Sequence, residues 1–195
     1  MPLREQGVDR VLLISFSVII ALGLFALFSA SMPVGFAKFG DAWFFVKRQF
    51  FFGILPGVII AIILCRLDLD IFRRLSWIIY ISSLILLSLV FVPQVGLTIN
   101  SSQSWLGIFG VTFQPAEFSK FAVVIILAYL LAQKKYDWND WQNSIVPVLA
   151  IMSPTLILIL LQPDIGTLSI IIAEIFAMLF IARVPFRFLA IMLII

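Results

Sequence analysis

Histidine is absent from this chain, cysteine occurs once, and charged residues are scarce. Its 195 residues include no His, a single Cys65 and only 12% Asp, Glu, Lys and Arg. Without histidine the chain can form neither a Ser-His-Asp triad nor a Cys-His pair, and one cysteine can form neither an internal disulfide nor an ordinary zinc site. Soluble domains have about a quarter charged residues, so the composition excludes a soluble enzyme, a disordered tail and a nucleic-acid-binding module.

Apolar residues, by contrast, make up 63% of the chain, and the mean hydropathy is +1.19. About 20 apolar residues cross roughly 30 Å of hydrocarbon. We therefore predict an all-α fold, a polytopic transmembrane helix bundle that forms a single transmembrane domain over residues 1–195. Six complete spans and the start of a seventh are predicted, approximately at 11–31, 49–65, 75–92, 114–132, 144–161, 165–182 and 188–195. The incomplete seventh would reach only about 12 Å as a helix, so we expect the chain to be the N-terminal portion of a longer protein.

Basic residues are distributed unequally between the two sides of the predicted bundle. If the N-terminus is cytoplasmic, the cytoplasmic side has Arg4, Arg10, Arg66, Arg73, Arg74, Lys134, Lys135, Arg183 and Arg187. The outer side then has only Lys38, Lys47, Arg48 and Lys120. Because Lys and Arg are enriched in cytoplasmic loops, the sequence predicts a cytoplasmic N-terminus.

Two of the predicted spans begin with similar residues. Gln114-Pro115-Ala116-Glu117 opens the fourth span and Gln162-Pro163-Asp164-Ile165-Gly166-Thr167 opens the sixth. In the predicted topology both helix N-termini open on the outer face. Proline suits a first helical turn, and an acid there favours the positive end of the helix dipole. One interpretation is therefore that both segments are ordinary helix starts.

The basic residues nearby favour a second interpretation. Lys120 lies about 9 Å below Gln114 at 1.5 Å per residue, a depth at which a charged side chain usually faces protein or water. Lys47 and Arg48 lie at the outer start of the second span, where they oppose both the positive-inside rule and the helix dipole. If packing brings them together, these groups and the helix N-termini form an anion-attracting mouth suited to a lipid pyrophosphate. The alternative is a Glu117–Lys120 ion pair that only neutralises itself.

Glu174 is a further candidate, as an acid inside a predicted span. It lies about 15 Å beyond Asp164 along the sixth helix. Intramembrane acids are functional candidates by default, so we predict Glu174 as a possible buried acid of the site.

Several short segments of the chain together resemble one known family. Phe44-Phe45-Val46-Lys47-Arg48-Gln49 leads into the second span, Val92-Pro93-Gln94-Val95-Gly96 precedes the outer loop, and that loop ends in Ser104-Trp105-Leu106. With the two Gln-Pro segments described above, the chain resembles the SEDS family of bacterial cell-wall proteins, whose members include FtsW, RodA and SpoVE. The resemblance covers essentially the whole chain and is strongest to the FtsW branch.

The resemblance implies a peptidoglycan glycosyltransferase of about ten helices. Such a protein polymerises lipid II, an undecaprenyl-pyrophosphate-linked substrate, into glycan strands at the outer face of the bacterial cytoplasmic (inner) membrane. The implied partners are a class B penicillin-binding protein and other division or elongation machinery, with no nucleic acid. The family's catalytic Asp would lie beyond Ile195, so no catalytic residue is predicted here and the chain alone is expected to be inactive. A divalent cation, Mg²⁺ or Mn²⁺, is left open as a cofactor.

Matching the motifs residue by residue places Glu117, Lys120 and Asp164 in the family's central cavity and Arg48 near its mouth. The full set predicted to line the cavity or to bind the lipid pyrophosphate is Lys47, Arg48, Trp105, Gln114, Glu117, Lys120, Gln162, Asp164 and Thr167. The chain departs from the family pattern in Ala116, where Ser is usual, and in an outer loop without a basic residue before Trp105.

Three further functions fit the same residues. A lipid II flippase needs a lipid-sized cavity as much as a polymerase does. The residues are equally consistent with an elongation-specific, RodA-type member and with a non-catalytic division scaffold.

Overall fold

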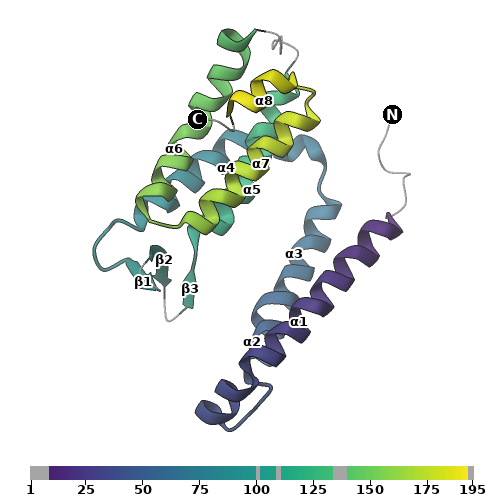
Figure 1. Cartoon of the computed structure of the whole chain (residues 1–195), viewed down its shortest axis with the longest axis vertical. Helices are drawn as coiled ribbons and strands as arrows, with labels where there is room; N and C mark the ends of the chain where they lie inside the picture. The colour runs from purple at the N-terminus through teal and green to yellow at the C-terminus, as the bar shows by residue number, and fades with distance from the viewer. Residues whose placement is uncertain (1–8, 100–101, 109–110, 134–139, 193–195) are drawn as a thin grey trace. The chain divides into compact units, whose positions relative to one another are not determined.

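The computed structural model describes residues 9–99, 102–108, 111–133 and 140–192. The described elements are mostly helical, as predicted (Figure 1). The chain divides into two compact units, Met1–Leu67 and Asp68–Ile195. Each unit is described separately below.

The first unit consists of a long helix followed by an interrupted one. Helix α1 covers Arg10–Phe39, α2 covers Phe44–Gln49, a π-helical turn covers Phe50–Ile54, and α3 covers Leu55–Arg66. Asp9 caps α1, because its carboxylate accepts hydrogen bonds from the Val11 and Leu12 amides at 2.9 and 3.2 Å. Gly40 ends α1 in the left-handed conformation with φ 68°, which glycine adopts without strain. The helix therefore continues beyond the span end predicted at residue 31.

The second unit is a helical bundle with a small sheet at one end. Its helices are α4 (Leu69–Leu89), α5 (Pro115–Leu131), α6 (Val146–Leu161, preceded by a π-helical turn at Trp141–Ile145), α7 (Ile165–Ile181) and α8 (Phe186–Met192). Helix α5 is central, because it packs against α4, α6 and α7. The fully buried side chains come from these helices and include Leu87, Val123, Ile126, Leu127, Met152, Ile159, Ile171 and Leu179.

A polar contact joins α4 to α6 within this core. The Tyr80 hydroxyl donates to the Ile151 carbonyl and accepts a hydrogen bond from the Thr155 hydroxyl at 3.0 Å. Both side chains are buried. A polar group that finds no partner in hydrocarbon costs several kcal/mol, so this closed pair allows two polar residues to lie between apolar helices.

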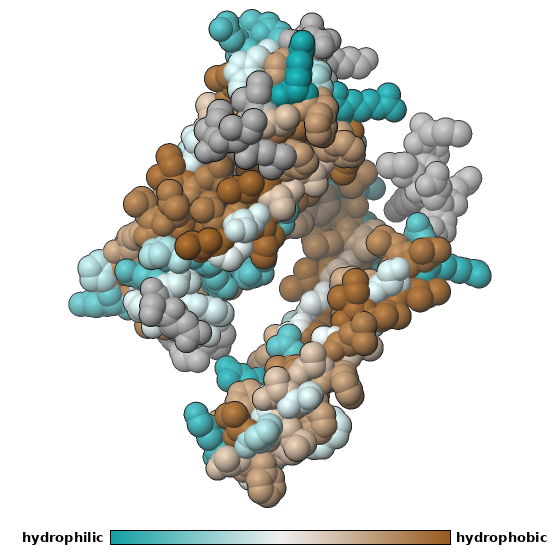
Figure 2. Space-filling model, viewed as in Figure 1, coloured by the Kyte–Doolittle hydropathy of each residue, from teal (hydrophilic) through white to brown (hydrophobic). Residues whose placement is uncertain are grey.

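Apolar side chains also cover the outside of the helices. In the second unit, Figure 2 shows a band of hydrophobic residues along the helices, with hydrophilic residues toward both ends. Four helical segments of the described chain are long and apolar enough to cross a membrane: Arg10–Phe39, Phe44–Arg66, Leu69–Leu89 and Trp141–Leu161. Helices α5 and α7 have 17 residues each and coincide with the predicted fourth and sixth spans. The number of spans stays a prediction, and the predicted end at 193–195 lies outside the described residues.

The connection between α4 and α5 contains an antiparallel sheet that the sequence did not indicate. Strand β1 covers Gly96–Ile99, β2 covers Ser102–Ile108 and β3 covers Val111–Phe113, in the order β1-β2-β3. The sheet is tied to the end of α4 by Gln103, whose Nε2 donates to the Val90 carbonyl at 3.0 Å. Strand β2 also packs against α5.

Gly96 makes the close approach between this sheet and α4 possible. A Cβ added at Gly96 would lie 1.9 Å from the Val90 carbonyl oxygen, so the backbone would have to move. We expect Gly96→Ala to lower the thermal unfolding midpoint in detergent by several degrees, because the sheet can no longer contact α4 there.

Gly23→Ala is the matched control for this change. A Cβ added at Gly23, inside α1, meets nothing within 4 Å, and alanine is favoured over glycine in a helix by about 0.5–1 kcal/mol. Its unfolding midpoint should stay the same or rise. Equal midpoints for Gly96→Ala and Gly23→Ala would contradict the close contact.

Candidate functional site

The two similar helix starts lie side by side in the second unit. Gln114 is the N-cap residue of α5 and Asp164 is the N-cap residue of α7. The Gln114 Nε2 donates to Asp164 Oδ2 at 2.9 Å, and the two helices pack along each other. The prediction that these segments begin helices is therefore confirmed, and both helices run in the same direction from one end of the unit.

The Asp164 carboxylate is fully engaged in this arrangement. Its Oδ1 accepts from the Thr167 amide at 3.0 Å, and its Oδ2 accepts from the Thr167 hydroxyl at 2.8 Å in addition to Gln114. An aspartate at the N-cap satisfies amides that have no partner within the helix. Asp164 and Thr167 thus fix the start of α7 and attach it to α5.

Gln162 has a structural position rather than an open one among the described residues. Its side chain is fully buried, its Nε2 donates to the Leu87 carbonyl at 3.1 Å, and its own backbone carbonyl accepts from the Ser102 hydroxyl at 2.8 Å. Gln162 therefore connects α4, the sheet and the corner between α6 and α7. The sequence did not identify Ser102 or Gln103 as contributors. The available signal was their polarity in an otherwise apolar chain.

Glu117 and Lys120 form an ion pair on α5. The Lys120 ammonium lies 2.9 Å from Glu117 Oε1 and Oε2. The Lys120 side chain is only 20% exposed, whereas that of Glu117 is 57% exposed. The self-neutralising pair that the spacing allowed is thus present, with its cation on the more buried side.

Glu174 lies further along α7 and is half-buried. Its Oε2 is buried and has no hydrogen-bond partner among the residues that the structure describes. The charged groups that act on it electrostatically are Lys120 and Glu117 of α5. Packing of α5 on α7 therefore brings the intramembrane acid close to the ion pair.

The remaining predicted site residues lie elsewhere. Trp105 is partly buried in β2 and pairs with Leu97 of β1. Lys47 belongs to the first unit, where its ammonium pairs with Asp41 at 2.8 Å. Arg48 lines a surface pocket of about 530 Å³ with Lys47 and Phe side chains of the same unit. Whether Lys47 and Arg48 join the residues of α5 and α7 stays a prediction.

Metal binding has little support from the donor atoms present. Within the described ranges, no group of three or more His, Cys, Asp or Glu residues could hold a metal ion. The carboxylate of Asp164 is already occupied by three donors. The requirement for a divalent cation stays a prediction.

Comparison with known proteins identifies the family. Residues 9–195 match the cell cycle protein family of FtsW, RodA and SpoVE. This chain belongs to that family. Stage V sporulation protein E of Bacillus subtilis is 32% identical over 182 residues, which cover 93% of this chain and 50% of that protein. A probable peptidoglycan glycosyltransferase FtsW of Trichlorobacter lovleyi is 32% identical over 181 residues, which cover 93% of this chain and 47% of that protein.

Solved structures of the family have the same fold. The rod shape determining protein RodA of Thermus thermophilus superposes with a TM-score of 0.66 at 30% identity, over 88% of this chain and 56% of that one. A structure described as "Structural coordination of polymerization and crosslinking by a peptidoglycan synthase complex" superposes with a TM-score of 0.65 at 30% identity, over 89% of this chain and 51% of that one. The chain is thus a multi-pass membrane protein of the FtsW, RodA and SpoVE family, and it spans about half the length of the curated relatives it matches.

The contact between Gln114 and Asp164 can be tested by reversing its polarity. We expect Gln114→Glu to destabilise the protein, because two carboxylates then face each other at the helix starts. Adding Asp164→Asn should restore stability, since asparagine is also a good N-cap and its amide can donate to the introduced carboxylate. We expect a loss of about 1–3 kcal/mol for the single change and recovery of most of it in the double variant, measured by unfolding in detergent. Additive losses would contradict the contact.

Asp41 offers a second test, through its titration. The hydrogen bond from Lys47, helped by the Trp43 amide, holds the pKa of the Asp41 carboxyl below its usual 3.8. Its contribution to folding is therefore present above pH 3.8 and is lost only as the pH falls through the lower folded value. We expect Lys47→Gln to move the Asp41 pKa back toward 3.8, measured from the carboxyl ¹³C chemical shift. An identical titration in both proteins would show that Lys47 is not bound to Asp41.

Proposed function

We propose that this chain forms the first part of a peptidoglycan glycosyltransferase that polymerises lipid II at the outer face of the bacterial cytoplasmic membrane. Membership of the FtsW, RodA and SpoVE family over residues 9–195 supports the proposal, as does the name of the FtsW relative. The structural observation that carries it is the hydrogen bond from Gln114 to Asp164. It places the two family motifs, with their charged side chains, at one end of the same bundle.

The chemistry of polymerisation requires two kinds of groups. A hydroxyl of the acceptor sugar attacks the anomeric carbon of the donor, and the bond from that carbon to the pyrophosphate oxygen breaks. A base accepts the hydroxyl proton, and cationic groups stabilise the departing pyrophosphate. We assign the second task to this chain. The base lies in the part of the protein that follows it.

Lys120 is the residue best suited to the pyrophosphate. Its ammonium is mostly buried and is held by a more exposed carboxylate, so an incoming phosphate can replace Glu117 as its partner. The N-termini of α5 and α7 add positive potential from the same end of the unit. Gln114, Asp164 and Thr167 hold the two helix starts in place, and Gln162 attaches them to α4. In the proposal, Lys47, Arg48 and Trp105 border the same substrate.

A class B penicillin-binding protein is the proposed partner. The solved structure of a peptidoglycan synthase complex, to which this chain is similar, is described as coordinating polymerization and crosslinking. A polymerase that releases glycan strands at the outer membrane face needs such a crosslinking enzyme beside it.

The proposal can be tested with the full-length protein that contains this chain, its penicillin-binding partner and purified lipid II. We expect Lys120→Gln to lower glycan strand synthesis at least tenfold, because the leaving pyrophosphate loses its cation. Lys38→Gln is the matched control, since it also removes one lysine charge, at an exposed position of α1, and should leave synthesis unchanged.

A charge reversal separates substrate binding from a purely structural ion pair. The variant Glu117→Lys with Lys120→Glu keeps an ion pair three residues apart on α5 but moves the cation to the exposed position. We expect it to fold with nearly normal stability and to stay inactive. Full activity of this variant would overturn the role of Lys120, and movement of lipid II across liposomes without strand synthesis would overturn polymerisation in favour of flipping.

A further inference from the structure

A cavity at the opposite end of α5 has no role in the proposed reaction. It lies between the start of α4 and the end of α5 and has a volume of about 330 Å³. The last turns of α5 that border it are about 20 Å from Gln114 at 1.5 Å per residue. All of its lining residues belong to the second unit.

The walls of the cavity are mainly hydrocarbon. They are formed by Leu69 and Phe72 of α4 and by Ile125, Ala128 and Ala132 at the end of α5. The two alanines leave space between the helices, because neither has a side chain beyond Cβ. Since this end of α4 begins an apolar helix long enough to cross a membrane, an acyl chain can enter from the bilayer.

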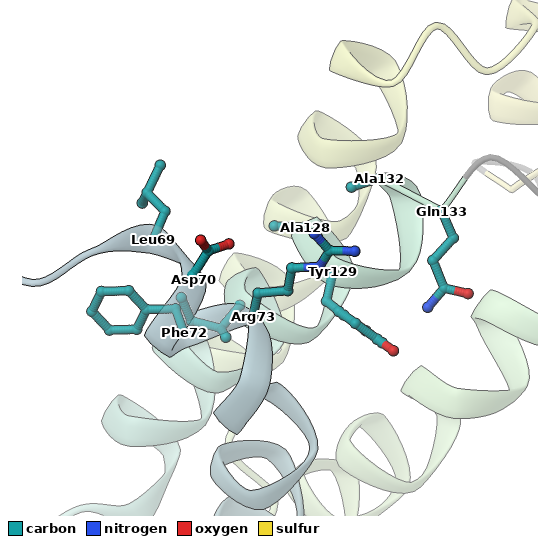
Figure 3. A pocket seen from close by; sticks show the side chains of 9 residues that line it. Leu69, Asp70, Phe72, Arg73, Ala128, Tyr129, Ala132 and Gln133 are labelled. Atoms are coloured by element: carbon teal, nitrogen blue, oxygen red, sulfur yellow. The ribbon is translucent and has the colours of Figure 1, made fainter. Parts of the chain in front are cut away.

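The edge of the cavity is polar and carries both signs of charge. Figure 3 shows Asp70 and Arg73 on α4, with Tyr129 and Gln133 at the end of α5. Asp70 and Arg73 are three residues apart, so they lie on one face of the helix with Cβ atoms about 5–6 Å apart. Among the residues that the structure describes, neither forms a salt bridge with the other or with a third residue. Both are exposed and available to a ligand.

This pattern of charge selects a dipolar headgroup. The Arg73 guanidinium presents a fork of donors that matches a phosphate. The Asp70 carboxylate would repel a second negative charge but would accept hydrogen bonds from a primary ammonium. Phosphoethanolamine carries a phosphate and an ammonium joined by a two-carbon linker, next to acyl chains that fit the apolar walls.

We propose that the cavity between α4 and α5 binds an aminophospholipid, with its phosphate on Arg73, its ammonium on Asp70 and an acyl chain against Phe72 and Ile125. The positive-inside bias predicts that this end of the bundle meets the cytoplasmic leaflet. The site is then a lipid contact that fixes the α4–α5 pair in the membrane, at the far end from the helix starts. It does not depend on the proposed polymerase activity.

Lipid retention measured by native mass spectrometry tests the proposal. The intact chain is released from micelles that contain equal amounts of phosphatidylethanolamine, phosphatidylcholine and phosphatidylglycerol. We expect phosphatidylethanolamine to be retained at least fivefold over each of the others. Phosphatidylcholine has the same charges without ammonium donors, and phosphatidylglycerol has no ammonium.

Two nearly isosteric changes divide the headgroup contacts. We expect Arg73→Gln to lower retention of phosphatidylethanolamine and phosphatidylglycerol at least fivefold, because the phosphate loses its partner. Asp70→Asn should lower phosphatidylethanolamine retention and raise phosphatidylglycerol retention, which reverses the preference. Arg74→Gln is the matched control, since Arg74 is the next residue of α4 but does not line the cavity.

A steric pair of variants tests the location. Ala128→Trp fills the cavity and should abolish selective retention, whereas Ala150→Trp, at an exposed position of α6 outside the cavity, should not. Preferential retention of phosphatidylglycerol by the unmodified chain would overturn the proposal. So would equal effects of Arg73→Gln and Arg74→Gln, or an unchanged preference in Asp70→Asn. If Ala128→Trp fails to fold, the two charge variants decide the outcome alone.

Discussion

The hydrogen bond between Gln114 and Asp164 is the contact on which the functional arrangement depends. It joins the N-cap residues of α5 and α7, so the two helices start together and run in parallel. Residues at similar distances from the two starts then have similar depths. Lys120 and Glu174 follow about 9 and 15 Å below these caps at the rise of an α-helix. One polar contact at the end of the bundle thereby brings an ion pair and a buried acid close together in an apolar environment.

The two ends of α5 carry different chemistry on one rigid element. Its start combines an N-cap amide, an ion pair and the neighbouring α7 start. Its end borders a hydrocarbon cavity edged by Asp70 and Arg73 of α4. Because α5 packs against three other helices along its length, neither end can move far without disturbing the core. A helix that is held in this way can position a reacting group at one membrane face while it contacts lipid at the other.

The sequence predicted the helices and the pairing of their starts better than it predicted the roles of single residues. Hydropathy identified the apolar segments because the bilayer imposes their length, and the repeated Gln-Pro segments marked the starts of α5 and α7. Gln162 was predicted to line a cavity, yet its side chain is buried against the Leu87 carbonyl. The sheet at Gly96–Phe113 was missed because its strands are short and its anchor is a contact between backbones. Such contacts depend on packing, which hydropathy and motif spacing do not determine.

The central claim is that the helix starts of α5 and α7, with Lys120 below them, hold the pyrophosphate of the lipid substrate. A structure of the full-length protein with bound lipid II tests it most directly, through the distance from the Lys120 ammonium to the nearest pyrophosphate oxygen. The account predicts an ion-pair distance of about 4 Å or less, with Glu117 displaced from Lys120. A pyrophosphate bound away from α5, with the Glu117–Lys120 pair intact, would contradict it.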